Sequence, residues 1–428
     1  MAAAFCMATL PATAQTNGSN SPYSRFGLGN LNDHAQGFNK AMSGLGIGIR
    51  NNKFINMQNP ASYSAIDSLT FLFDVGMTFQ NANFKNGNQS INAHNTTLNY
   101  VNAAFRLAPG LGISFGFVPY STIGYNFSES KYLGEHFNNG NTITYTNTYT
   151  GDGGIHETYI GLGWRPFAQL SIGANAGFLW GEYSQNIKQT FYENGTESTS
   201  SKGLNRNVEA NFSTYKIDFG AQYPISINKN NDLTLGVTYS LGHTIKNPAR
   251  YSSYVTDGDS TNVTIKDAFD YPHTIGAGLS WQHNNKLTIG ADVSYQKWGS
   301  CRMPQIINDE FVSSSANYKD RTRFVLGGEY QPDPISRKYI KRIYYRFGAS
   351  YATPYYKING VNGPREIGVT AGVGLPLSNK ISSRSYINVS FQWLNVSADS
   401  PSLITENYLR LNIGITFNEK WFMKWKIQ

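Results

Sequence analysis

Beyond its first 68 residues the chain alternates apolar and polar residues with a period of two, which is typical of β-strands with one apolar face. In LTIGADVSYQ (287–296) the Leu, Ile, Ala, Val and Tyr residues form one face, and Asp292 lies among the polar residues of the other. The segments RIYYRFGASY, YINVSFQW and YLRLNIGITF repeat this arrangement. The pattern predicts an all-β protein whose sheet has an apolar side and a polar side.

About 14 segments have the length of a strand that crosses a bilayer, roughly ten residues or more. Their expected spans are 69–82, 95–107, 111–127, 155–166, 169–190, 207–223, 232–247, 271–283, 286–299, 320–331, 341–353, 364–377, 384–396 and 406–417. Links after even-numbered strands are short or modest, whereas links after odd-numbered strands are mostly longer and polar, such as 128–154 and 248–270. This asymmetry predicts a transmembrane antiparallel β-barrel over residues 69–428 in a Gram-negative outer membrane, with short turns and both termini periplasmic.

A soluble β-sandwich or propeller would also alternate, so the placement of charge decides between the two classes. Charged residues gather on the polar face, where a lumen could pair them while the other face meets lipid: Asp74, Arg106, Asp218, Asp292, Arg323, Glu329, Arg346, Glu366 and Arg410. Tryptophans near strand ends fit interfacial girdles: Trp164, Trp180, Trp281, Trp298 and Trp393. Both observations favour the membrane barrel.

Composition points the same way. Only 14% of residues are charged, against about 25% in soluble domains, and the chain has 28 Tyr, 25 Phe and 42 Gly. The formal net charge of +8 comes from scattered Lys and Arg without a basic run, which argues against nucleic-acid binding. No apolar run approaches the roughly 18 residues of a transmembrane helix. If the chain spans a membrane, it does so as a barrel.

The first residues, MAAAFCMATLPATAQ, resemble the end of a secretory signal peptide, with an A-x-A-like cleavage site that ends at Ala14. We expect residues 1–14 to be removed, and Cys6 with them. The mature chain would then keep only Cys301, which excludes an intramolecular disulfide.

Residues 15–68 follow no helix or strand period and precede the first strand. Barrels of about eight strands are filled by side chains, whereas wider ones hold a channel or a plug. We therefore expect residues 15–68 to form an N-terminal plug, or hatch, in the lumen.

Two stretches carry a resemblance to a known family. The first includes AMSG at Ala41–Gly44 and NPASYSAI from Asn59, and its motif residues are Ala41, Ser43, Gly44, Asn59, Pro60 and Ala61. The second is GLGISFGFVPYSTIGYNF, residues 110–127. Both are similar to the FadL/TodX transporters of the Gram-negative outer membrane. The Asn- and Tyr-rich composition and the ending NEKWFMKWKIQ resemble members from Bacteroidetes-type bacteria.

The resemblance implies a plugged 14-stranded barrel that takes up hydrophobic compounds and releases them laterally at a kinked third strand. The implied partners are outer-membrane lipid and a hydrophobic ligand or detergent in the lumen. Pro119 interrupts the third predicted strand, and proline is confined to strand edges, strand starts and bulges. The candidate lateral gate implied by the resemblance is Gly116, Val118, Pro119, Tyr120 and Ser121, and the alternative is a bulge at Pro119 that only bends the strand.

The predicted lumen, however, lacks a continuous apolar tunnel. Its inward faces are polar and charged, with few apolar residues: Tyr100, Tyr159, Leu179, Tyr344 and Tyr408. An alternative therefore stays open, in which the chain is a non-transporting barrel subunit of an outer-membrane complex for protein secretion or barrel assembly. Its partners would be envelope lipoproteins or another barrel.

Other signals are weaker. The glycines Gly44, Gly46 and Gly48 lack the βαβ unit of a nucleotide-binding loop, so we assign them to turns in the plug. The acidic loop residues Asp152, Asp257, Asp259 and Asp267 could hold Ca²⁺, but a solvated loop is the preferred interpretation. No His spacing indicates a metal, and no nucleophile elbow or cofactor motif is found. We therefore predict a protein that is not an enzyme and holds no cofactor.

Overall fold

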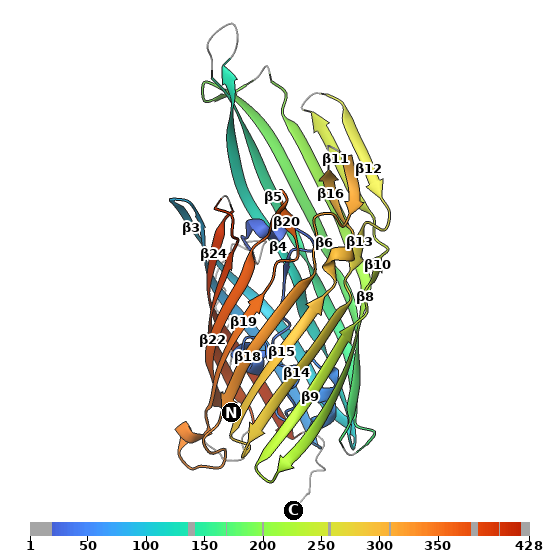
Figure 1. Ribbon diagram of the computed structural model, residues 1–428, viewed down its shortest axis with the longest axis vertical. Coiled ribbons are helices and arrows are strands. Elements are labelled where there is room, and N and C mark those ends of the chain that lie inside the picture. The colour runs from blue at the N-terminus through green and yellow to red at the C-terminus, as the bar shows by residue number, and fades with distance from the viewer. Residues whose placement is uncertain are drawn as a thin grey trace, which may run out of the picture.

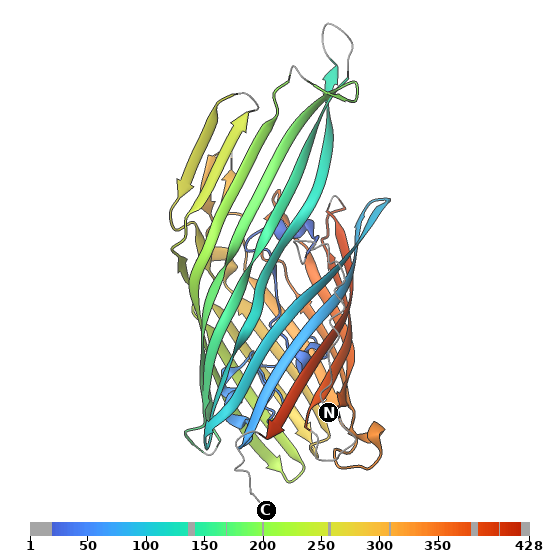
Figure 2. The ribbon, with the colours of Figure 1, turned by 180° about the vertical axis from the view of Figure 1, so that it is seen from behind.

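The computed structural model describes residues 19–135, 142–167, 169–198, 201–255, 258–307, 310–377, 384–401 and 403–420. The predicted signal peptide and residues 421–428 of the C-terminal ending lie outside these ranges. Fourteen strands form one closed antiparallel barrel (Figures 1 and 2). The wall strands are β2 (Thr70–Asn86), β3 (Gln89–Ala108), β4 (Leu111–Glu135), β5 (Thr142–Trp164), β6 (Ser171–Glu193), β8 (Leu204–Asn228), β9 (Asn231–Ser240), β14 (Thr274–His283), β15 (Leu287–Gln296), β18 (Arg321–Tyr330), β19 (Tyr344–Ala352), β22 (Arg365–Pro376), β23 (Tyr386–Ser397) and β24 (Thr405–Lys420).

The pair β2–β24 closes the barrel, with Thr70 opposite Lys420 and Lys85 opposite Thr405. All other wall neighbours are consecutive in the list above. Each wall strand overlaps one of the fourteen predicted spans, because the alternating pattern that favours a strand is also what divides lipid from lumen.

Two predicted loops prove to be largely strand. Residues 128–135 and 142–154 extend β4 and β5 as a long antiparallel pair, and the described part of 248–270 contains β11 (Ala249–Val255) and β12 (Ser260–Ile265) and reaches β13 (Phe269–Tyr271). The first stretch is rich in Thr and Tyr, which favour strands over loops. Strand β11 pairs with the upper part of β8, so an open sheet β4-β5-β6-β8-β11-β12 rises above the barrel (Figure 1).

The outer face of the barrel is apolar, as the alternation predicted. Large apolar side chains lie exposed on wall strands around the barrel, for example Ile160, Leu235, Leu326 and Phe391. This is the surface expected where a wall meets lipid. No helix in the described residues is long and apolar enough to cross a membrane.

The tryptophan girdle requires one correction. Trp164, Trp180 and Trp393 are 50%, 41% and 44% exposed on the outer face. Trp298 instead lies in the short 3-10 helix η3 (Trp298–Ser300) and is fully buried, with its ring 4.8 Å from that of Tyr355. The chain leaves the strand period after Gln296, where β15 ends, so alternation no longer determines the direction of this side chain.

The remaining elements are short. The N-terminal part holds η1 (Pro22–Arg25), β1 (Asn30–Leu31), α1 (Gly37–Lys40) and η2 (Pro60–Ala65). The links between wall strands hold β7 (Thr196–Glu197), β10 (His243–Ile245), β16 (Met303–Ile307), β17 (Glu310–Ser314), η4 (Tyr339–Arg342), β20 (Lys357–Ile358) and β21 (Val361–Asn362).

Candidate functional site

The N-terminal segment, residues 19–69, runs through the interior of the barrel (Figure 1). Residues 35–49 are buried without exception. Phe38 and Leu45 are 1% and 0% exposed, and they pack with Phe54 and with Tyr344 of the wall. The segment therefore forms an apolar core inside a lumen whose wall is largely polar.

Side chains of the wall hold this segment by its backbone. Asp292 on β15 accepts hydrogen bonds from the amides of Gly46 at 2.7 Å and Ile47 at 2.9 Å. Ser280 on β14 donates to the carbonyl oxygen of Gly48 at 2.7 Å. An irregular segment has no ladder of its own, so its buried amides and carbonyls need such partners.

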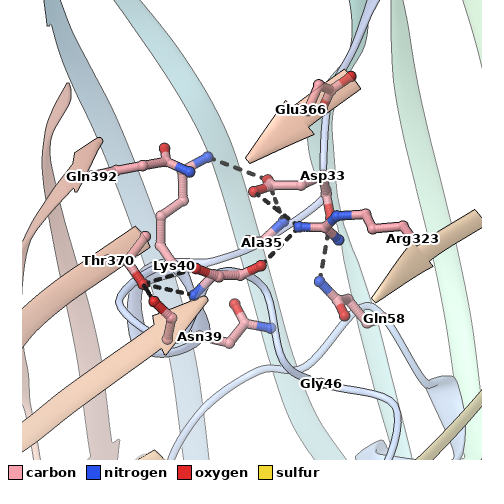
Figure 3. A network of polar contacts seen from close by, with 12 residues as sticks. Asp33, Ala35, Asn39, Lys40, Gly46, Gln58, Arg323, Glu366, Thr370 and Gln392 are labelled. Carbon is pink, nitrogen blue, oxygen red and sulfur yellow. Dashed lines mark hydrogen bonds and ion pairs between the residues drawn. The ribbon is translucent and has the colours of Figure 1, made fainter. Parts of the chain in front are cut away.

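Figure 3 shows a second set of contacts, around Arg323 on β18. Its guanidinium donates to the carbonyl oxygen of Ser43 at 2.7 Å and lies 3.9 Å from the carboxylate of Asp33. Asp33 also pairs with Lys40 at 3.4 Å. Thr370 on β22 donates to the carbonyl oxygen of Ala41 and accepts from the amide of Ser43, at 2.8 and 2.9 Å. Inward charges of the wall are thus matched by charges and backbone groups of the segment.

Glycines in the wall allow close approach of the segment backbone. A Cβ atom on Gly236 would lie 2.0 Å from the carbonyl oxygen of Ile47, and one on Gly348 would lie 2.3 Å from the carbonyl carbon of Met42. Backbone atoms cannot yield as a flexible side chain can, so these strand positions require glycine.

The predicted motif residues lie at two places where the N-terminal segment contacts the wall. Asn59 caps η2 by accepting from the amide of Ala61, with Pro60 at the first helical position, and its side chain also donates to Ile47. Ala41, Ser43 and Gly44 form a turn against β18 and β22, in which Ser43 and Gly44 have φ of 53° and 84°. The motif residues shape the segment and its contacts with the wall.

A cavity of about 340 Å³ remains between the segment and the wall. Its lining is rich in charge, and includes Asp33, His34, Lys40, Lys216, Asp218, Arg321, Glu366 and Arg410. Of the five apolar lumen candidates only Tyr408 is among the lining residues, and Tyr100, Tyr159, Leu179 and Tyr344 are buried in three separate apolar clusters. The described residues therefore do not bring the five candidates together into one apolar site.

Sequence reasoning missed part of the charged interior. Lys216 on β8 contacts Glu157 on β5 at 3.1 Å and Asp218 at 2.5 Å, and Glu157 is completely buried. His34 of the segment lies 3.8 Å from the second oxygen of Glu157. Both Glu157 and Lys216 have the inward parity of their strands, so alternation could have identified their direction but not their pairing.

The wall is interrupted between β3 and β4. Their pairing extends only from Ala108 opposite Leu111 to Val101 opposite Phe117, although both strands continue well above this point (Figure 2). The register of β4 with β5 shifts between Pro119 and Ser121. The ladder thus breaks at the predicted position, because proline lacks the amide hydrogen that pairing requires.

Residues of the N-terminal segment lie at this break, which we call the seam. Asn30 and Leu31 form β1 and pair with Thr122 and Ser121 of β4. On the other side, Asn20 donates to Asn95 of β3 at 3.3 Å. The cavity reaches the seam, since Leu98, Pro119 and Tyr120 are among its lining residues.

The other gate candidates are tightly packed. Val118, Tyr120 and Ser121 are buried. A Cβ atom on Gly116 would lie 2.0 Å from the side-chain oxygen of Asn102 and 2.6 Å from the backbone oxygen of Val101. A bulky residue at Gly116 would therefore disrupt the β3–β4 pairing rather than obstruct a gate.

Within the described residues no group of three His, Cys, Asp or Glu side chains could hold a metal ion. Of the possible calcium ligands, Asp257 lies outside the described residues, and Asp152 and Asp267 are in β5 and just after β12.

Comparison with solved structures identifies the fold. A FadL homologue from Pseudomonas aeruginosa has a TM-score of 0.60 at 12% identity, over 90% of this chain and 98% of that one. The toluene transporter TbuX from Ralstonia pickettii gives 0.57 and 15%, over 90% and 99%. TodX from P. putida gives 0.56 and 14%, over 92% and 100%. These proteins share the barrel fold with this chain, which confirms the predicted resemblance at the level of fold.

The sequence itself matches a different family. No curated protein matches significantly. The family model that matches is that of BamG, and it covers residues 1–428. The chain therefore belongs to the BamG family, with the outer-membrane barrel fold of the FadL and TodX transporters.

Proposed function

We propose that this protein is a non-transporting outer-membrane barrel that serves as a subunit of a multi-protein envelope complex for protein secretion or barrel assembly. The observation that carries the proposal is the filled and charged lumen. The N-terminal segment acts as a fixed plug, because wall residues such as Asp292 and Arg323 bind its backbone directly. The cavity between the plug and the wall has many ionic groups in its lining, which would disfavour an apolar solute.

The family and the shape support the same proposal. The matching family is BamG, and the fold alone is shared with the hydrocarbon transporters. The rim with the short turns is periplasmic in this proposal, with both termini on that side. The open sheet β4-β5-β6-β8-β11-β12 then stands outside the cell and offers partners a surface far larger than a loop.

The test is purification of the full chain, tagged on an extracellular loop, from gently solubilised outer membranes. The proposal expects a stoichiometric set of envelope lipoproteins or another barrel to remain bound through size-exclusion chromatography. A lone barrel that carries only lipid and detergent would overturn it. An unrelated barrel of similar abundance, purified in parallel, controls for adventitious association.

The seam favours a second candidate, uptake of a hydrophobic compound with lateral release. The cavity reaches the break in the β3–β4 ladder, and a wall without continuous pairing is where a solute could leave. The test is entry of radiolabelled toluene and of a long-chain fatty acid into cells with and without the protein. Equal entry in both strains excludes this candidate.

A further inference from the structure

We infer that the free edge of β4 above the seam is a docking site for an extended strand of a partner subunit, which adds to the open sheet. This inference rests on the proposed function and specifies the contact by which the barrel binds its partner. The occupant is a polypeptide in β conformation, held chiefly through its backbone.

The first observation is that β4 lacks a neighbour along much of its length. On the side away from β5, it pairs with β3 only up to Phe117 and with β1 at Ser121 and Thr122. From Tyr125 to Glu135 no described strand pairs with this side, whereas β5 covers the other side throughout. Exposed edges of this length invite pairing with another chain, and natural proteins generally protect them.

The second observation is that this edge already accepts a strand. Strand β1 adds to β4 in antiparallel register, and the amide of Asn32 donates to the carbonyl oxygen of Tyr120 at 2.9 Å. One step further along, the hydroxyl of Ser24 accepts from the amide of Gly124 at 3.1 Å. Beyond this point no described residue of the N-terminal segment pairs with β4 as a strand, so a second strand could continue along the same edge where β1 ends.

The parity of these bonds identifies the groups that a partner would use. Backbone groups of Tyr120 and Gly124 point away from β5, and in an antiparallel ladder successive residues alternate in direction. The register of β4 with β5 has no shift from Ser121 to Tyr132. The amides and carbonyls of Asn126, Ser128 and Ser130 therefore face the free edge.

Side chains around this edge define the kind of strand that fits. Outward, Asn126, Ser128 and Ser130 are exposed, neutral and polar, which places this stretch outside the lipid. Inward, Phe127 stacks on Tyr149 at 4.9 Å, with the guanidinium of Arg25 4.6 Å from the Tyr149 ring centre. The partner strand would present apolar or aromatic residues inward and neutral polar residues outward, as β-strand addition requires.

Features near the tip limit where docking occurs. Lys131 pairs with Glu129 at 3.2 Å, and the register with β5 shifts between Tyr132 and Gly134. Charges and bulges are the usual means by which an edge is protected. The stretch open to docking therefore ends at Ser130, before Lys131 and the bulge, and Glu129 is the one charged residue between Tyr125 and Ser130.

The experiment compares Ser130→Pro with Ser130→Ala in the full chain, purified from outer membranes with its partners. Proline removes the amide that faces the free edge and leaves the β4–β5 bonds intact, whereas alanine keeps the amide and loses only the hydroxyl. We expect partner recovery to fall at least about tenfold for Ser130→Pro, because proline removes a hydrogen bond to the partner strand and prevents close approach of its backbone. Recovery should stay at the wild-type level for Ser130→Ala. Both variants should keep heat-modifiable gel migration, which reports a folded barrel.

A second measurement uses a photo-crosslinking residue at Ser128 and, as control, at Lys188. Lys188 lies in the same outward row, two strands from the edge, because Thr148 of β5 pairs with both residues. A crosslink to a partner at position 128 and none at 188 supports the docking site. Partner recovery unchanged in Ser130→Pro, or a crosslink only to a second copy of this chain, overturns it while the proposed function stands. If the wild-type protein recovers no partner, the proposed function itself fails.

Discussion

Asp292 gives the sharpest test of how the N-terminal segment is held. Its carboxylate accepts from two buried amides, those of Gly46 and Ile47, from a strand 246 and 245 residues away in sequence. Asp292→Ala leaves both amides without an acceptor. At roughly 1.5 kcal/mol for each hydrogen bond to a charged group, docking of this part of the segment should weaken by about 3 kcal/mol.

A loss of this size raises the fraction of molecules in which this part of the segment is detached from the wall by roughly 100-fold. Limited trypsin digestion of the folded barrel measures it, because cleavage after Arg50 tracks the equilibrium opening when reclosing is fast. Mass spectrometry of the fragment that ends at Arg50 separates this event from cuts in exposed loops. We expect cleavage about 100-fold faster in Asp292→Ala than in the wild type.

Two further variants make the result interpretable. Asp292→Asn keeps an oxygen that can accept from both amides and should cost only about 1 kcal/mol. Asp232→Ala removes an acidic residue whose hydrogen bond with Ser226 is exposed to solvent, so this variant should be cleaved at the wild-type rate. Wild-type cleavage in Asp292→Ala, with the barrel folded, would refute the claim that these bonds hold the segment in place.

Four other outcomes are expected. Because the β2–β24 pair closes the ladder, unboiled protein in detergent should migrate faster on a denaturing gel than boiled protein, and identical migration would contradict a closed barrel. Deletion of residues 15–64 should give an inserted barrel that conducts small ions across a planar bilayer; unchanged conductance would mean that the segment does not obstruct the lumen. Gly236→Val should displace the segment at Ile47 and raise cleavage after Arg50, whereas Gly195→Val, at a turn glycine with φ of 81° and open space around it, strains only that turn and should not. Burial and the nearby carboxylates of Asp270 and Asp320 raise the pKa of the Cys301 thiol to about 12, so folded protein at pH 8 should resist maleimide and unfolded protein should react fully.

The sequence by itself determined the strands of the wall and the direction of their side chains. Successive side chains of a strand alternate between the lipid and the lumen, and this alternation is visible in the local sequence. The inward positions of Asp292 and Arg346 and the outward position of Phe347 could therefore be predicted from it. The break at Pro119 was predictable for a similar reason, since the missing amide is a property of the residue itself.

Only the tertiary structure decided what these inward groups contact. Pairings such as Asp292 with Gly46 join residues more than 200 positions apart, and no local pattern encodes which backbone groups of an irregular segment will lie opposite which strand. The same limit explains why Trp298 was misassigned, and why Glu157 and Lys216 were not identified as partners. The free edge of β4 also emerged only in three dimensions, because an edge is defined by the neighbour that a strand lacks.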